Sequence, residues 1–455
     1  MGGIFFLGLG VAILMAIYLS RQAKTKKFAD GTLQPKNNPA NILPPLRRDH
    51  LATIKGFGPD KVTEEAILRQ QIGQEEDFRT CESHRFTPTG FSAEEVRQLG
   101  DFPNYASLSG VALPNPYRDF DIERALPRPY RPFRWSYHQT MSISKMETDW
   151  WIELENTYRA RLQQRKALYQ KSGRTVLDYL PGSELACNEL MEMVLQFLCA
   201  RYPHYFSLAG TVFHNDILET TIDVTSKHPL EILLDNVPED FAIMLRDDKT
   251  GDYYFRAGII CSSIGWTLSD KMGLRLDRIH DPVPDYKEKM EISMNRFFTK
   301  MPTDKPLQRG SWNLEIGQPL HLPKDNPNET ERISQDPHLQ LNDCYLRVDW
   351  QTLRRLPLSA GVVFNFKALF TPVTEFRDEP KIPRLLLEIL QNGKKNLMDY
   401  KKTWHVEHVV VPKLKEWSEE QEVAGLVDPE WVVTSLDESP WFAGWEDKWH
   451  RQQGF

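Results

Sequence analysis

The sequence predicts an α+β fold in which hairpin-joined strands form a sheet and helices group around it. Two hydrophobic segments, 241–246 and 253–261, flank the polar, glycine-containing turn 247–252, which is typical of a β-hairpin. Two further strand candidates, 344–351 and 361–370, follow later in the chain. Hydrophobic residues at helical spacing dominate before and after these strands. A doubly wound parallel sheet would require strands and helices in regular alternation, which the chain does not show.

Composition describes an ordinary folded protein. The chain has 455 residues, of which 26% are charged and 40% hydrophobic, and 56 basic and 63 acidic residues give a formal net charge of -7. No cluster of basic residues in the folded part offers the positive surface that nucleic-acid binding needs, so we expect no nucleic-acid partner. The five cysteines are widely spaced and form no CxxC motif, which predicts reduced thiols.

The N-terminal segment 2–20 contains no charged side chain. As a helix with a rise of about 1.5 Å per residue it would be about 28 Å long, which matches the hydrocarbon core of a bilayer. Basic residues follow this segment instead of preceding it, as in a retained anchor and unlike a cleaved signal peptide. They are Arg21, Lys24, Lys26 and Lys27. We therefore expect a single-pass anchor at 1–20, in the endoplasmic reticulum membrane, with the body in the cytosol.

The remaining chain divides into a linker, a body and a tail. The basic, proline-rich linker covers 21–50, and the body covers 51–414. The tail, 415–455, is rich in Glu and Trp and is expected to pack on the body. The sequon Asn328-Glu-Thr330 would carry a glycan only if the body were lumenal, so it tests the predicted orientation.

Helices are predicted at several places in the body. Ser92 and Glu95 have the spacing of a capping box, and 101–135 is rich in proline and aromatic residues and is expected to be loop. A long helix is predicted from Asp149, because hydrophobic residues recur on one face. Further helices are predicted over 183–202, 286–299 and 385–390.

Common enzyme signatures are absent from the sequence. It has no Walker A loop, GxSxG elbow, HExxH motif, kinase signature or glycine-rich dinucleotide fingerprint in the body. His405 and His408 would lie on one face of a helix and suit a metal, but the following VVVP run weakens the helix prediction, so an exposed, non-ligating pair is favoured. Cys261 is interpreted as a buried, inert thiol. Glu239 and Asp240 are adjacent on a strand, so one of them at most faces a pocket.

The most suggestive constellation runs from Trp266 to Trp312 and contains Ile279-His-Asp-Pro-Val-Pro284. The two prolines restrict the backbone around His280, which suits a pre-positioned proximal haem ligand whose second ring nitrogen Asp281 would hold. Arginines for the haem propionates are available near this motif. The candidates are Arg275, Arg278 and Arg309. On composition alone, a loop histidine satisfied by hydrogen bonds remains the favoured alternative.

Several ordered motifs resemble the haem-dependent oxidative N-demethylase family, in a fungal-type, membrane-anchored form. The resemblance covers roughly 120–395. Its motifs are Arg128-Pro-Tyr-Arg-Pro-Phe133, Pro238-Glu-Asp-Phe-Ala-Ile-Met244, Gly265-Trp266, Asp270-Lys-Met-Gly273, Ile279-His-Asp-Pro-Val-Pro284, Arg309-Gly-Ser-Trp312, Arg347-Val-Asp-Trp-Gln-Thr-Leu-Arg-Arg-Leu-Pro357 and Gly361-Val-Val-Phe364.

The resemblance implies a haem b protein with a PAS-like antiparallel sheet, in which iron activates oxygen to hydroxylate an N-methyl carbon, releasing amine and formaldehyde. Carried onto this chain, it makes His280 the iron ligand, Arg275, Arg278 and Arg309 the propionate partners, and Trp266 and Trp312 the pocket walls. No residue is assigned to the chemical step. Because the chain has no flavin or iron–sulfur motif, a separate reductase is expected as electron donor.

The chain departs from the bacterial pattern at two places, which leaves its substrate open. Asp349-Trp350 stands where the bacterial members are expected to have Glu-Arg, and Gly310-Ser311 stands where they have Ser-Asn. A lipophilic or secondary metabolite is therefore as credible a substrate as a small amine. Two other functions compatible with the fold are a haem-binding sensor or carrier without turnover and an interaction protein without haem.

Overall fold

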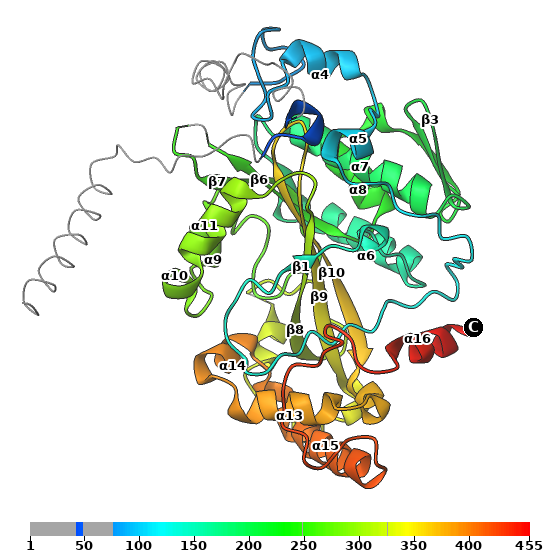
Figure 1. The fold of residues 1–455 in the computed structure, drawn as a ribbon, viewed down its shortest axis with the longest axis vertical. Helices are drawn as coiled ribbons and strands as arrows, with labels where there is room; N and C mark the ends of the chain where they lie inside the picture. Colours follow the sequence, from blue (N-terminus) through cyan, green and yellow to red (C-terminus); the bar gives the residue numbers. More distant parts are fainter. Residues whose placement is uncertain (1–41, 49–75, 248, 325) are drawn as a thin grey trace, which may run out of the picture. The chain divides into compact units, whose positions relative to one another are not determined.

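A seven-stranded sheet, in the order β1-β8-β9-β10-β6-β7-β2, organises the unit Ile42–Phe455 (Figure 1). The computed structural model describes residues 42–48, 76–247, 249–324 and 326–455. The strands of this sheet are β1 (Ser144–Lys145), β2 (Leu177–Tyr179), β6 (Asp240–Arg246), β7 (Tyr253–Ile259), β8 (Leu307–Ile316), β9 (Cys344–Arg355) and β10 (Val362–Pro372). Neighbouring strands pair antiparallel throughout, which confirms the predicted α+β class.

Both predicted strand pairs are present. Strands β6 and β7 form the expected hairpin, with Arg246 opposite Tyr253. Strands β9 and β10 pair along their whole length, and β9 continues four residues beyond Gln351, because Leu353 and Arg355 keep burying alternate side chains. A smaller antiparallel sheet, in the order β3-β4-β5, lies apart from this one. Its strands are β3 (Phe206–Ala209), β4 (Val212–Asn215) and β5 (Thr220–Asp223).

Strand β8 was not anticipated as a strand, although it carries the Arg309-Gly-Ser-Trp312 motif. Glycine and polar residues interrupt its hydrophobic alternation, which lowers its apparent strand propensity. The glycine is required sterically: a Cβ atom at Gly310 would lie 2.8 Å from Pro132 Cβ. The close approach of 132 to β8 explains why a side chain is missing at this strand position.

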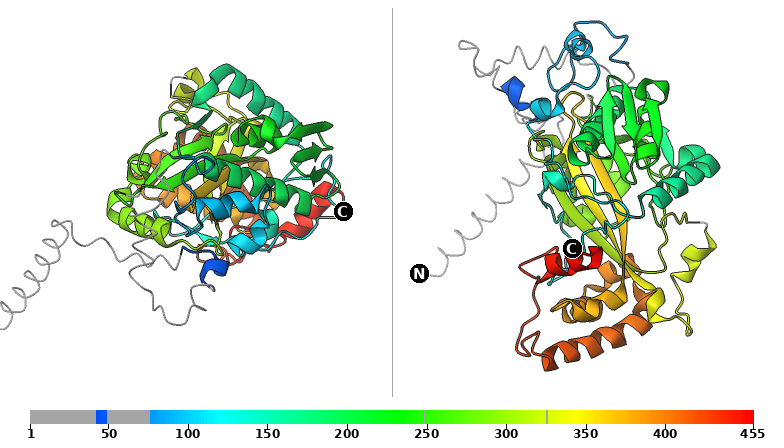
Figure 2. Two further views of the ribbon diagram at one scale, coloured as in Figure 1. Left: turned by 90° about the horizontal axis from the view of Figure 1, so that it is seen from above. Right: turned by 90° about the vertical axis from the view of Figure 1, so that its right-hand side faces the viewer.

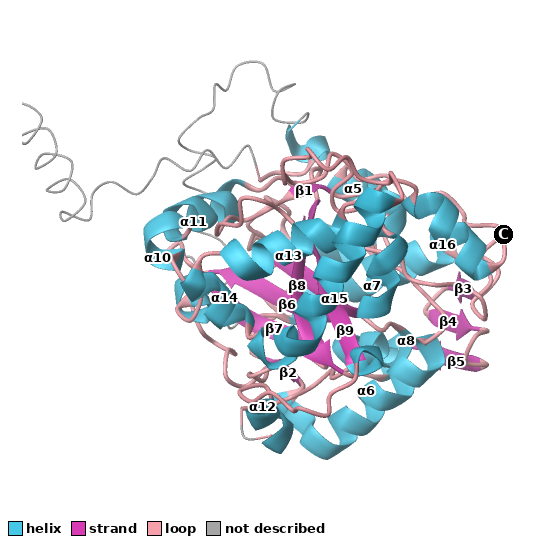
Figure 3. Cartoon of the chain, turned by 90° about the horizontal axis from the view of Figure 1, so that it is seen from below, coloured by secondary structure: helices cyan, strands magenta, loops and turns pink. Residues whose placement is uncertain are grey.

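Helices cover both faces of the large sheet (Figure 1, Figure 2). One face is covered by α9 (Leu276–His280), α10 (Tyr286–Lys289) and α11 (Glu291–Lys300), which share a hydrophobic cluster with Phe366 of β10. We call this the α9 face. The opposite face packs on α6 (Tyr158–Ser172), α7 (Glu184–Arg201), α8 (Pro229–Asn236), α13 (Ile382–Asn392) and α15 (Trp404–Val423). Figure 3 shows the strands between α9–α11 and α6–α8, with α13 and α15 in front.

The remaining helices are short and lie outside these groups. They are α4 (Ala93–Leu99), α5 (Tyr105–Ser109), α12 (Pro327–Glu331), α14 (Lys395–Lys401) and α16 (Trp445–Gln453). The predicted capping box is present at α4, where Ser92 and Glu95 bond each other's backbone N–H groups. In the tail, the Trp449 indole donates to Leu126 O at 2.9 Å, and Trp441 stacks on Tyr130.

The long helix expected from Asp149 begins at Tyr158, so this prediction was wrong by nine residues. The preceding residues form a short 3-10 turn and an extended segment. Trp151 Nε1 donates to Asn365 Oδ1 on β10, and the Glu153 carboxylate accepts from Arg128 N and from the Tyr130 hydroxyl. Because these side chains are held on different partners, the hydrophobic spacing here reflects burial of an irregular segment and not a helix.

The other predicted helices are present. Helix α7 ends at Arg201, two residues before Pro203, and the predicted helix over 286–299 is divided at Met290 into α10 and α11. The predicted anchor and most of the linker lie outside the described residues. Within the part of the chain that is described, no helix is both long and apolar enough to span a bilayer.

Candidate functional site

His280 is the last residue of α9, and one of its ring nitrogens is fixed by the backbone. Its Nδ1 lies 2.7 Å from Leu276 O, one helical turn earlier. A carbonyl oxygen only accepts hydrogen bonds, so Nδ1 carries the proton in the neutral imidazole and the lone pair resides on Nε2. This tautomer is the one that binds metals through Nε2.

The surroundings of His280 keep its imidazole neutral. The ring stacks on Tyr286, with centroids 5.1 Å apart and an angle of 16° between the planes. Burial, together with the positive charges of Lys271 and Arg309, lowers the pKa of His280 to about 4. The hydrogen bond to Leu276 O raises this pKa, but its effect is smaller than that of burial. Asp281, which we expected to hold the second ring nitrogen, instead pairs with Arg278. The carbonyl of Leu276 takes the expected place of that carboxylate.

Two of the three predicted propionate partners are already paired with carboxylates. Arg275 binds Asp277 at 2.5 Å and Asp252 at 3.2 Å, and its side chain is 41% exposed. Arg278 pairs with Asp281 at 3.3 Å and is 64% exposed. Arg278 is two residues from His280, about 200° around a helix, so the two side chains point away from each other. The structure does not bring Arg275 or Arg278 to the Nε2 side of His280.

Arg309, the third predicted partner, is placed differently. It lies on β8 opposite Gln351 of β9, which in turn is opposite Phe366 of β10, so all three share the α9 face. Its buried Nε has no hydrogen-bond partner, and none of the described carboxylates forms an ion pair with it. Burial, and next the charge of Arg134, lowers the pKa of Arg309 to about 10. An unpaired buried guanidinium of this kind suits an anionic group that is bound separately.

The α9 face is incompletely covered at its centre. Central strand positions on this face stay partly exposed, although their neighbours on the opposite face are buried. These positions are Ala242, Arg309, Ser311, Asp349, Gln351 and Phe364. The register places them on the same face as Phe366, which packs in one hydrophobic cluster with α9–α11.

Two further cations near Arg309 were missed by the sequence analysis. Lys401, the last residue of α14, donates to Trp312 O at 2.5 Å, and burial, with a smaller contribution from Arg309, lowers its pKa to about 7. Arg134 lies in a loop, and burial lowers its pKa as well. Neither forms a salt bridge with a described residue. No local pattern marks them, because a loop and a helix end more than 260 residues apart meet only in the folded chain.

The two predicted wall tryptophans lie in different environments. Trp266 packs against the same hydrophobic cluster as α9, with Lys271 Nζ 3.7 Å from its ring centroid. Trp312 is buried on the face opposite to Arg309, because its side chain is three positions along the same strand, and packs edge-on against Phe133 at 5.0 Å. Only Trp266 is therefore brought to the side of His280.

The alternative site candidates show no sign of chemistry. His405 and His408 both lie in α15, which continues through Pro412, so the expected break at the VVVP run was wrong. His405 Nδ1 contacts Lys402 O and His408 Nε2 contacts Asp336 O. His405 is fully buried and His408 half-buried, so the predicted exposure of the pair was wrong. In the described ranges no three His, Cys, Asp or Glu side chains are grouped as a metal site would require.

The thiols and the adjacent carboxylates are also accounted for. All five cysteines are free, as predicted, and burial raises the pKa of Cys261 to about 12, which makes its thiol inert. Asp240 accepts from the backbone N–H groups of Cys261 and Ser262 and pairs with Arg165. Burial raises the pKa of Glu239 to about 7. Asp240 thus supports the chain around 261, while the Glu239 carboxylate accepts from Asn365 Nδ2 at 3.4 Å.

The arrangement on the α9 face fits a haem. A haem needs an axial donor and cationic partners for two carboxylates. His280 offers Nε2 in the neutral state, and Arg309 on the same face is a buried cation that forms no ion pair with a described residue. Arg134 and Lys401 lie near Arg309 and also form no salt bridge with a described residue, although the Lys401 amine lies over the Trp312 ring. Such a set of unpaired charges is unfavourable by itself and becomes favourable once anions are bound.

A comparison with protein families gives an independent result. Residues 142–411 match the model of a family described as "haem-dependent oxidative N-demethylase, alpha subunit-like". The match covers more than half of the 455 residues and includes α9, β8, β9, β10 and α14, on which His280, Arg309 and Lys401 lie. The chain therefore belongs to the haem-dependent oxidative N-demethylase, alpha subunit-like family.

Proposed function

We propose that this protein is a haem-dependent oxidoreductase of the monooxygenase type that removes an N-methyl group oxidatively from an amine or a lipophilic metabolite. Membership of the family supports the haem dependence and the class of reaction. The single observation that carries the proposal to this chain is the state of His280. Its Nδ1 is bonded to Leu276 O, its Nε2 forms no hydrogen bond with a described residue, and nearby Arg309 forms no ion pair with one.

In this proposal His280 would bind the haem iron, and Arg309, with Arg134 and Lys401, would hold the propionates of haem b. Trp266 forms part of the pocket wall. The bound haem supplies an iron centre that activates oxygen. The protein groups bind and orient the cofactor, and burial keeps His280 neutral and therefore able to donate its lone pair.

The positions that depart from the bacterial pattern support a substrate other than a small alkylamine. Ser311 on β8 and Asp349 on β9 are directly opposite each other on the α9 face, and both are partly exposed. Trp350 points to the other face and stacks on Tyr130 at 4.0 Å. Two changed side chains thus adjoin the proposed cofactor site, where they would contact a bound substrate.

We further propose that residues 2–20 anchor the protein in the endoplasmic reticulum membrane and that a separate cytosolic reductase supplies electrons. The basic residues after the apolar segment support this orientation. Asn328 is exposed on α12, so a lumenal body would be glycosylated there. Glycosidase-sensitive sugar on Asn328 would contradict the cytosolic orientation.

The test is an absorption spectrum of the full-length protein, expressed with haem supply and purified in detergent, in the oxidised and dithionite-reduced states. We expect a Soret band that shifts on reduction. His280→Ala should lose or strongly alter this band, whereas His214→Ala should not, since His214 is a half-buried residue of β4 in the small sheet, apart from the α9 face. An unchanged spectrum and haem stoichiometry in His280→Ala would refute the ligand assignment.

A second measurement separates the proposed enzyme from the two alternatives. Methylated amines and lipophilic N-methyl compounds are screened for reductase-dependent formaldehyde release and oxygen consumption. Haem binding without substrate-linked oxygen consumption would indicate a sensor or carrier. Absence of haem from well-folded protein would indicate an interaction protein of the same fold.

A further inference from the structure

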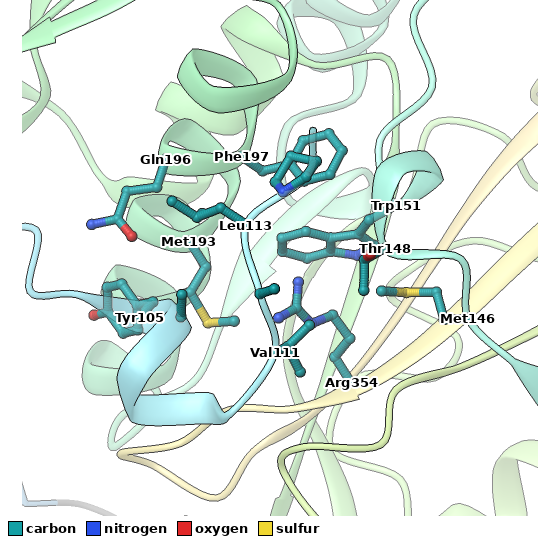
Figure 4. A pocket seen from close by; sticks show the side chains of 13 residues that line it. Tyr105, Val111, Leu113, Met146, Thr148, Trp151, Met193, Gln196, Phe197 and Arg354 are labelled. Atoms are coloured by element: carbon teal, nitrogen blue, oxygen red, sulfur yellow. The ribbon is translucent and has the colours of Figure 1, made fainter. Parts of the chain in front are cut away.

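A pocket lies on the opposite side of the sheet from His280, and a single arginine enters it. Arg354, near the end of β9, points into the space between Trp151 and Met193 (Figure 4). Val111 and Leu113 form another wall, from the loop after α5. The pocket has an empty volume of about 330 Å³, which includes its opening to solvent.

The Arg354 guanidinium has no anionic partner in the described chain. The residue is only 7% exposed, yet its buried Nε has no hydrogen-bond partner. Burial alone lowers the pKa of Arg354 to about 9, with no charged group near enough to oppose it. Its guanidinium carbon lies 4.0 Å from the ring centroid of Trp151, a contact that orients the cation without neutralising its charge.

The neighbouring residue provides a contrast within the same motif. Arg355 is also buried, but it donates to the carbonyl oxygens of Met301, Phe298 and Ala360 and to the Tyr253 hydroxyl. Its role is to hold the ends of β9 and α11 together. Arg354 makes none of these hydrogen bonds, so nothing in the fold itself accounts for its buried charge.

The polar groups around the pocket are committed elsewhere. The Glu192 carboxylate accepts from the Tyr105 hydroxyl at 2.6 Å and from Phe102 N at 3.1 Å. The Gln196 amide nitrogen donates to the carbonyl oxygens of Phe102 and Pro103. What remains facing the space is one cation and the Thr148 side chain among apolar and aromatic side chains, which matches a ligand with one negative charge and an apolar body.

We propose that this pocket binds a small apolar carboxylic acid, with its carboxylate on Arg354 and its hydrocarbon body among Val111, Leu113 and Met193. A monocarboxylate balances a single guanidinium and accepts two parallel hydrogen bonds from it. The space is small and part of its volume is open solvent, so the body is at most a single ring or a short chain. The site is separate from the proposed haem site, because Arg354 and its neighbour Leu353 point to opposite faces of the sheet.

The test is the thermal unfolding midpoint of the full-length protein with phenylacetate or hexanoate at millimolar concentration, compared with the uncharged amides of the same shape. We expect the acids to raise the midpoint by about 2 °C or more and the amides to leave it unchanged. Equal effects of acid and amide, or no effect of either acid, would overturn the proposal.

Variants locate the binding to this pocket. Arg354→Met keeps an apolar stem of similar length and removes the charge, so it should weaken the acids at least about tenfold. Met193→Trp fills the pocket while keeping Arg354, so it should also reduce the shift that the acids cause. This variant tests the site if Arg354→Met does not fold. Arg278→Met, which removes an exposed arginine of α9, is the matched control and should keep the full shift. Retention of acid binding by Met193→Trp and Arg354→Met would refute the assigned site. None of these readouts depends on haem or turnover.

Discussion

Arg309 lies directly opposite Gln351 in the antiparallel register of β8 and β9, with both side chains on the α9 face of the sheet. The same row continues through Phe366 of β10, which packs in one hydrophobic cluster with α9. This relationship brings the charge of Arg309 close enough to lower the pKa of His280. His280 and Arg309 are 29 positions apart in the sequence, and the sheet register makes them parts of one site.

Removing the charge of Arg309 should weaken haem binding selectively. Arg309→Met should reduce the bound haem per protein chain, because a buried cation that faces a propionate contributes about 1.5 to 3 kcal/mol through a charged hydrogen bond. The measurement is haem stoichiometry by the pyridine haemochrome spectrum. Arg278→Met is the matched control, since its side chain is exposed and paired with Asp281. Equal losses in both variants would show that the unpaired state of Arg309 has no special role.

Haem affinity should decrease as the pH rises above 7, and Lys401 should cause the decrease. Burial holds the pKa of Lys401 at about 7 instead of 10.5, so the free protein at pH 8 to 9 carries mostly neutral Lys401. A bound propionate raises this pKa, so haem binding takes up a proton, and affinity falls by up to about tenfold per pH unit between 7 and 10. The measurement is the haem dissociation constant across that range.

Lys401→Met supplies the control for this pH dependence. The variant keeps a side chain of similar length against the Trp312 ring, which Lys401 Nζ approaches to 4.1 Å. It should bind haem more weakly at pH 7 and with a flatter pH profile than the wild type. His280 does not contribute in this range, because its pKa is about 4 and its imidazole is already neutral. A wild-type profile in Lys401→Met would contradict the prediction.

Much of the sheet was predictable because hydrophobic alternation and turn residues act locally. The hairpin of β6 and β7 is marked by the polar turn between them, and the two long strands β9 and β10 by continuous apolar runs. Strand β8 was not predicted, because Gly310 interrupts its hydrophobic alternation. A glycine is required there by the close approach of Pro132. The start of α6 was predicted wrongly, because the side chains of Trp151 and Glu153 are held by partners outside this segment.

The candidate site was predictable only in part, for a related reason. His280 stands out through the prolines that follow it, and its nearest arginines in sequence, Arg275 and Arg278, were chosen for their proximity along the chain. Helix geometry directs Arg278 away from the imidazole, and nearby aspartates pair with both arginines. Lys401 comes near Arg309 only in the folded chain, so no sequence pattern indicates its role.

Acid should destabilise the folded protein partly through His280. Its folded pKa of about 4 lies below the ordinary value of 6.5, so the unfolded chain binds a proton more readily. The stability that neutral His280 confers is complete above pH 6.5 and is lost as the pH falls toward 4, at up to about 1.4 kcal/mol per pH unit. His280→Phe, which retains a ring to stack on Tyr286, should show a shallower decline in the haem-free protein.

Denaturant unfolding between pH 4 and 7 measures this slope in the wild type and the variant. His214→Ala is the control, because its imidazole is half-buried on the small sheet, where it bonds to the Thr221 hydroxyl. The decline should not vanish in His280→Phe, since burial also lowers the pKa values of His228 and His405 to about 4. A slope unchanged by His280→Phe would mean that His280 is protonated equally easily in both states.

A buried ion pair connects the N-terminal part of the body with the segment after β10, and its loss should be costly. Arg131 donates to both oxygens of Glu379 at 2.7 Å, and both side chains are almost fully buried. Arg131→Met would leave the Glu379 carboxylate with Lys448, at 3.2 Å, as its remaining cation. We expect a loss of about 3 to 5 kcal/mol in the free energy of unfolding, because a buried charge loses its bidentate partner.

Denaturant unfolding of the full chain measures this loss, and two further variants establish its cause. Arg377→Met breaks the exposed pair with Glu420, which should contribute little to stability because solvent screens it. The double variant Arg131→Met with Glu379→Met removes the stranded carboxylate, while Lys448 keeps Asp378 and Glu375 as partners. If desolvation of an unpaired Glu379 causes the loss, the double variant should recover part of it. If the double variant is less stable than Arg131→Met, the two side chains stabilise the fold by packing and not through their charges.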